Sequence, residues 1–147
     1  MKLTLDRGLK IYEVEDIDGT PLGTIKINPA DLGIVGRLAQ TRDNLAAMAE
    51  KINDNIDPKM LNEIDANVKA EINNIFNSDV APIFFASVSA LALCDDGTMV
   101  FEKVLNAIAP IIEDAVGDAM KASQKRMEKY TATYSNTDKG LAPGQQA

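Results

Sequence analysis

Two residue pairs, Asn28-Pro29 and Asp57-Pro58, divide this chain and indicate where two helices begin. Asn and Asp side chains accept hydrogen bonds from the free N–H groups of a first helical turn, and proline fits there because its missing N–H costs nothing. Between the pairs, a series of mostly apolar positions steps by three and four residues, as in a helix that packs a narrow face against a partner helix. These positions are Val35, Leu38, Arg42, Leu45, Ala49, Ile52 and Ile56.

The pairs therefore predict a helical hairpin, with helices at about residues 29–56 and 58–76. Arg42 is the one charged residue in the apolar series of the first helix. Either its aliphatic stem covers the edge of the core, or it is a polar residue that fixes the register of a pairing. The second helix continues the helical spacing at Leu61, Ile64, Val68, Ile72, Ile75 and Phe76.

Two further helical segments are predicted after residue 77. Residues 80–93 follow a potential cap at Ser78-Asp79 and are apolar nearly all round, which is typical of a segment buried on several sides. A last helix at about residues 98–129 contains Pro110, so we expect it to kink or to be interrupted there. Residues 131–147 are polar and contain glycine and proline, which predicts a flexible tail.

The N-terminal part has a different periodicity. Apolar and polar residues alternate in residues 9–15 and again in 22–27, on either side of a turn that contains Asp18-Gly19. This pattern predicts a β-hairpin over residues 9–27 with one buried face. The expected fold is α+β and mainly α, with the hairpin followed by a four-segment helical bundle in a single domain over residues 1–130.

The residue types needed for most catalytic sites are scarce. The chain has no histidine and one cysteine, so the usual base for a Ser or Cys nucleophile and a common metal ligand are missing. Carboxylates at Asp95, Asp96, Asp114 and Asp118 could hold a hard cation, but capping and solvated helix faces explain them better. We predict no catalytic residue, no cofactor, no metal and no enzyme activity.

Composition also limits the compartment and the partners. Cys94 has no second cysteine to pair with, the first residues lack the apolar core of a signal peptide, and residues 80–94 are too short to span a bilayer. The net charge of −7 and the small basic cluster near the end argue against nucleic acid. We expect a protein of the bacterial cytoplasm that contacts neither membrane nor nucleic acid.

The order of these elements resembles that of tail assembly chaperones of long-tailed bacteriophages and Gram-positive prophages. The resemblance covers about residues 9–130 and rests on Ile75-Phe76 followed by a loop, on residues 98–112 around Pro110, and on residues 126–130. The loop departs from the expected Gly-rich acidic pattern, because it reads Asn77-Ser78-Asp79.

The resemblance implies a non-catalytic protein that binds the tape-measure protein of the phage tail before the tail tube polymerises around it. The tail tube protein is a second candidate partner, and a homo-oligomer is an open alternative. We expect partner contacts from exposed apolar helix faces and from the end of the chain. The candidate residues are Arg42, Leu45, Ile52, Tyr130 and Tyr134.

Three alternatives stay open at this point. A structural tail or connector component of the virion would share this fold and composition. An enzyme that uses carboxylates and a divalent cation is the second alternative. A DNA-binding regulator that uses the basic residues 121–129 is the third.

Overall fold

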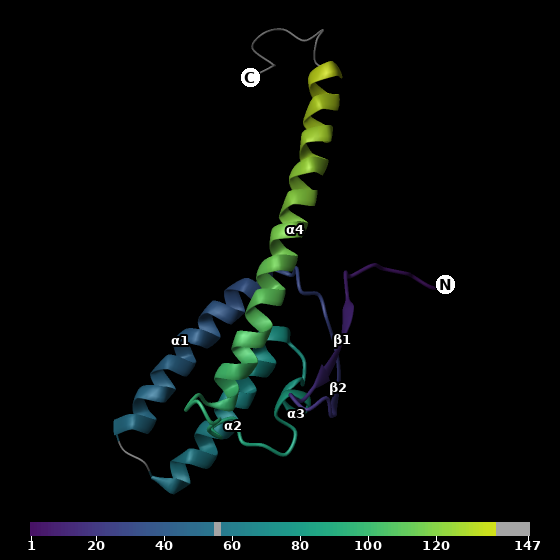
Figure 1. The fold of residues 1–147 in the computed structure, drawn as a ribbon. Coiled ribbons are helices and arrows are strands. Elements are labelled where there is room, and N and C mark those ends of the chain that lie inside the picture. The colour runs from purple at the N-terminus through teal and green to yellow at the C-terminus, as the bar shows by residue number, and fades with distance from the viewer. Residues whose placement is uncertain (55–56, 138–147) are drawn as a thin grey trace.

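The computed structural model describes the backbone of residues 1–54 and 57–137 and the side chains of residues 1–52 and 57–129. In chain order, these residues form a two-stranded sheet and four helices (Figure 1). The predicted order of an N-terminal hairpin and a mainly helical remainder is confirmed. The elements are β1 (Lys10–Glu15), β2 (Pro21–Ile27), α1 (Leu32–Asp54), α2 (Pro58–Phe76), α3 (Ala81–Phe85) and α4 (Val100–Thr137).

The two strands form an antiparallel hairpin in which Tyr12 pairs with Ile25 and Lys10 with Ile27. Gly19 takes a φ of 88° in the turn, a conformation that glycine adopts without strain. Alternation places Tyr12 and Ile25 on the inner face of the sheet, where Ile25 is buried. Within the described chain β1 pairs only with β2, so its other side is a free sheet edge.

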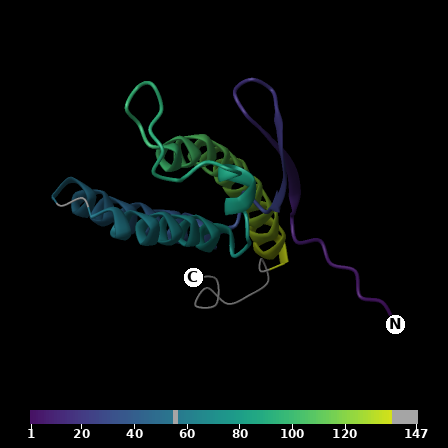
Figure 2. The same cartoon turned by 90° about the horizontal axis from the view of Figure 1, so that it is seen from below.

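Helices α1 and α2 form the predicted helical hairpin and supply much of the core (Figures 1 and 2). The predicted start of the first helix at Asn28-Pro29 is wrong, because α1 begins at Leu32 and it is the Asp31 carboxylate that accepts a hydrogen bond from the first turn, from the Gly33 N–H at 2.9 Å. Asp57 caps α2, and its side chain accepts a hydrogen bond from the N–H of Lys59. The predicted positions Leu38, Leu45 and Ile52 are buried. The buried positions of α2 are Ile64, Val68, Ile72, Ile75 and Phe76, all of them predicted.

The predicted face of α1 is wrong in part. Val35 and Arg42 are exposed, and the buried positions one residue earlier are Ile34 and Thr41. Thr41 is tolerated in the core because its hydroxyl donates to the backbone oxygen and a carboxylate oxygen of Glu71, each at 3.4 Å. Ile56, the last predicted position, lies outside the described residues.

The predicted helix at residues 80–93 is wrong in its extent, because α3 ends at Phe85. Ala86 has a φ of 48°, which interrupts the right-handed helix. The chain that follows is held to α2 by Asp65, which accepts hydrogen bonds from the Ser89 hydroxyl at 2.9 Å and from the Ala90 N–H at 2.7 Å. In this segment, hydrogen bonds to the Asp65 side chain thus replace the backbone hydrogen bonds of a helix.

Helix α4 passes through Pro110 as one element, so the expected interruption does not occur. Pro110 lies on the exposed side of the helix, where water can solvate the Asn106 carbonyl that lacks its usual donor. The helix extends to Thr137, beyond the predicted end near residue 129. The remaining tail residues, 138–147, lie outside the described part.

The first part of α4 packs into the core through Phe101, Leu105, Ile108 and Ile112. The helix then continues well past the other elements (Figure 1). Every side chain from residue 117 to residue 129 is exposed. The molecule therefore consists of a packed body and one projecting helix.

Candidate partner-binding surfaces

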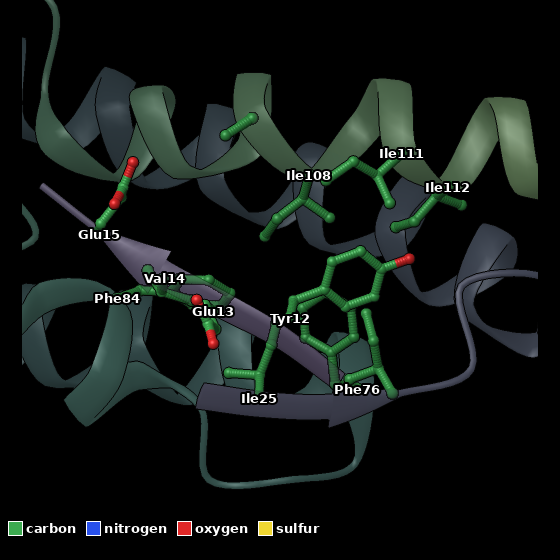
Figure 3. Close-up of a pocket in the computed structure, with 12 residues that line it drawn as sticks. Tyr12, Glu13, Val14, Glu15, Ile25, Phe76, Phe84, Ile108, Ile111 and Ile112 are labelled. Atoms are coloured by element: carbon green, nitrogen blue, oxygen red, sulfur yellow. The ribbon is translucent and has the colours of Figure 1, made fainter. Parts of the chain in front are cut away.

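An apolar groove lies between the hairpin and α4 (Figure 3). It consists of two adjoining cavities of about 250 and 520 Å³, and both are lined by Val14, Glu15, Phe84 and Ala107. Consecutive residues of β1 form one wall, and α4 forms the other. We call it the β1–α4 groove.

The floor of the β1–α4 groove is made of aromatic and branched side chains. Phe76 and Phe84 pack with their ring centroids 6.3 Å apart, and Ile108 and Ile112 approach from α4 (Figure 3). Tyr12 extends from β1 toward α4 above this floor. The groove therefore combines an apolar floor with the unpaired edge of a strand, two features that together suit an extended peptide.

The rim of the β1–α4 groove is acidic on its strand side. Glu13, Glu15 and Asp16 line it, and all three are exposed. Lys103 also lines the groove, but its ammonium group forms an ion pair with Asp96 at 2.6 Å. The strand side of the groove thus favours a basic ligand.

A second cleft of about 390 Å³ lies between α1 and α4. Val35 and Leu38 line it from α1, and Val116 lines it from α4. Arg42 is exposed at this cleft, which agrees with a stem that covers the edge of the core. Arg42 is therefore accessible to a partner.

Two other predicted contact residues are not accessible. Leu45 is 3% exposed and Ile52 is 9% exposed, because α2 covers this face of α1. Their apolar spacing indicates intramolecular packing, and neither side chain can contact a partner in this fold. The side chains of Tyr130 and Tyr134 lie outside those that the structure describes, so their role stays a prediction.

The projecting part of α4 carries exposed apolar side chains. Met120 is 46% exposed and Met127 is 49% exposed, and they stand seven residues apart on one side of the helix. Val116 precedes them on the same side and is half-buried. Basic residues lie between and beside Met120 and Met127, and this charge in the sequence indicates that the end of α4 lies outside the core.

The carboxylates considered as cation ligands either accept hydrogen bonds from other residues of the protein or are exposed. Asp96 accepts hydrogen bonds from Lys103 and from the hydroxyl and N–H of Thr98, which hold the pKa of its carboxyl well below the usual range. Asp114 and Asp118 are exposed on α4. Within the residues that the structure covers, no group of three His, Cys, Asp or Glu side chains could hold a metal ion.

None of the helices in the described ranges is both long and apolar enough to span a membrane. Comparison of the chain with protein-family models, with curated proteins and with solved structures gives no match.

Proposed function

We propose that this protein is a non-catalytic tail assembly chaperone that binds the tape-measure protein of a long-tailed phage in the cytoplasm of the bacterial host. The observation that carries the proposal is the projection of α4 beyond the body, with Met120 and Met127 exposed along one side. Helical segments without tertiary contacts are marginally stable in water, so a projecting helix with an apolar side favours a partner that packs along it.

The charge of the projecting helix supports a polypeptide client with acidic residues. Lys121, Lys125 and Arg126 flank the exposed methionines. An amphipathic client helix would place its apolar side on Met120 and Met127 and its acidic side chains against these bases. Methionine suits this role because its flexible side chain adapts to irregular apolar partners.

The test is co-expression with the tape-measure protein encoded nearby, followed by measurement of the fraction of that protein that stays soluble. The wild-type chain should raise this fraction, and Met120→Glu should remove most of the effect by placing a charge in the contact. Ala122→Glu is the matched control, because it introduces the same charge on the opposite side of the same exposed turn. An unchanged soluble fraction with the wild-type chain would refute the proposal.

The composition of purified phage particles separates this function from a structural role. A chaperone is absent from the finished particle, whereas a tail or connector component remains in it in fixed ratio. Mass spectrometry of purified virions that finds this chain in stoichiometric amount would favour the structural alternative.

A further inference from the structure

The first seven residues form an exposed arm with the pattern of a strand. Met1, Leu3 and Leu5 alternate with polar residues, and their side chains are 129%, 85% and 69% exposed. The arm leaves the body and has no strand partner within the described chain (Figures 1 and 2). Three large apolar side chains at alternate positions are therefore presented to solvent without any packing.

The root of the arm is fixed so that it points away from its own groove. The Asn28 side-chain amide donates a hydrogen bond to the Arg7 carbonyl at 2.9 Å. Gly8 bends the chain there with a φ of 66°, and a Cβ at this position would lie 2.7 Å from the Asn28 amide nitrogen. The arm would have to break this arrangement to fold back along its own β1.

The β1–α4 groove matches the arm in length, pattern and charge. An extended segment of five residues spans about 17 Å, close to the length of the six-residue β1. Added to the free edge of β1, the arm would place its leucines over Phe84 and the floor of the groove. Lys2 would then lie on the outer face of the sheet, which carries Glu13 and Glu15.

We propose that the β1–α4 groove binds the N-terminal arm of a second copy of this chain, as a strand added to the edge of β1. This self-association goes beyond the proposed chaperone function and uses a different surface from the projecting helix. It covers the apolar side chains of the arm, the apolar floor of the groove and the unpaired strand edge in one contact.

Sedimentation equilibrium of the full chain over a range of concentrations tests the proposal. The wild-type chain should self-associate. Leu5→Glu in the arm and Ala107→Glu in the groove wall should each weaken association about tenfold or more, because each places a charge in the apolar contact. Ala107 is exposed in the single chain, so its variant should keep the wild-type thermal midpoint.

Matched controls separate this contact from general effects of charge. Thr4→Gln is a neutral change on the opposite face of the arm, and Asn106→Glu adds a charge at an exposed position one residue away from Ala107 on α4. Both should associate like the wild type. A wild-type chain that stays monomeric, equal losses in the controls, or association lost only with Met120→Glu would overturn the proposal.

Disulfide trapping in a Cys94→Ser background identifies the occupant. A chain with Leu3→Cys mixed with a chain with Ala107→Cys should give a cross-linked pair of chains on oxidation, since disulfides form only between closely placed residues. Thr4→Cys in place of Leu3→Cys should cross-link much less. If one chain with both cysteines forms only an internal bond at every concentration, the arm occupies its own groove and the proposal fails.

Discussion

Asp65 joins α2 to the irregular segment after α3 through one carboxylate. It accepts hydrogen bonds from the Ser89 hydroxyl and the Ala90 N–H, and it pairs with Lys69 at 3.0 Å. Lys69 in turn lies over the Phe85 ring at 5.9 Å from its centroid. This one residue of α2 thus holds the irregular segment that replaces the predicted third helix.

The electrostatics of Asp65 combine two opposed effects. Partial burial raises the pKa of its carboxyl, but the hydrogen bonds from Lys69, Ala90 and Ser89 together lower it by more, so the pKa lies below its usual value. Because the pKa in the folded state is below that of the unfolded chain, the carboxylate stabilises the fold above the unfolded pKa. This stabilisation is lost as pH falls through the folded pKa.

We predict that Asp65→Ala lowers the free energy of unfolding by about 1–3 kcal/mol at neutral pH, because it leaves the N–H of the fully buried Ala90 without an acceptor. Urea denaturation at several pH values measures the effect. The difference from wild type should shrink as pH falls from about 5 to about 2. Asp114→Ala, also helical but exposed, should change stability by about 0.5 kcal/mol or less. A difference for Asp65→Ala that is independent of pH would contradict the assigned role of the charge.

At the scale of elements, α1 shows that a helical repeat does not by itself fix which face is buried. Two overlapping stripes run along this helix, one through Val35 and Arg42 and the other through Ile34 and Thr41. The structure buries the second stripe because the Thr41 hydroxyl finds an acceptor in Glu71, whereas burial of Arg42 would desolvate a charge. Leu38, Leu45 and Ile52 lie close enough to both stripes to be buried in either case.

The register of α1 predicts unequal effects for two truncations of apolar side chains. Leu45→Ala should lower the free energy of unfolding by about 2–5 kcal/mol, because it opens a cavity between α1 and α2. Val35→Ala should lower it by less than about 1 kcal/mol, since Val35 is 44% exposed. Chemical denaturation of the two variants measures both. Equal losses would indicate that α1 is rotated from the face described.

Local signals in the sequence were sufficient for most elements. The Asp18-Gly19 turn with its alternating flanks predicts the hairpin, and Asp57-Pro58 predicts the start of α2. The prediction of one helix over residues 80–93 failed for two reasons. The apolar composition of this segment does not reveal the left-handed conformation of Ala86, nor the hydrogen bonds that the segment donates to Asp65, a residue far away in the chain. Pro110 did not interrupt α4 because it lies on the exposed side.

At the scale of the whole molecule, the β1–α4 groove could not be predicted from local patterns. It brings residues 12–17 beside residues 100–112, with Phe76 of α2 and Phe84 of α3 between them. The alternation of the arm was readable in the sequence, but its lack of a partner was not. Arg42 is accessible to a partner, unlike the predicted contact residues Leu45 and Ile52. The exposure of Arg42 depends on how far along α1 the packing of α4 extends, and local sequence patterns do not reveal this contact.

The projection of α4 predicts that the end of the chain contributes little to the stability of the body. Deleting residues 131–147 should move the thermal midpoint by no more than about 2 °C, because α4 is exposed from residue 117 to residue 129 and packs no core there. Differential scanning calorimetry of the full and shortened chains measures this. A large fall in the midpoint would show that the removed residues contact the body.

Because α4 extends far beyond Val116, a small tilt of the helix near the body causes a large displacement at its far end. At 1.5 Å per residue, positions 117–137 extend about 30 Å, so a tilt of about ten degrees at the root moves the far end by roughly 5 Å. The tilt is set where Ile108 and Ile112 pack into the core. Adding or removing a methylene at those two positions would therefore displace a partner bound at the far end of α4, although the changed residues do not contact that partner.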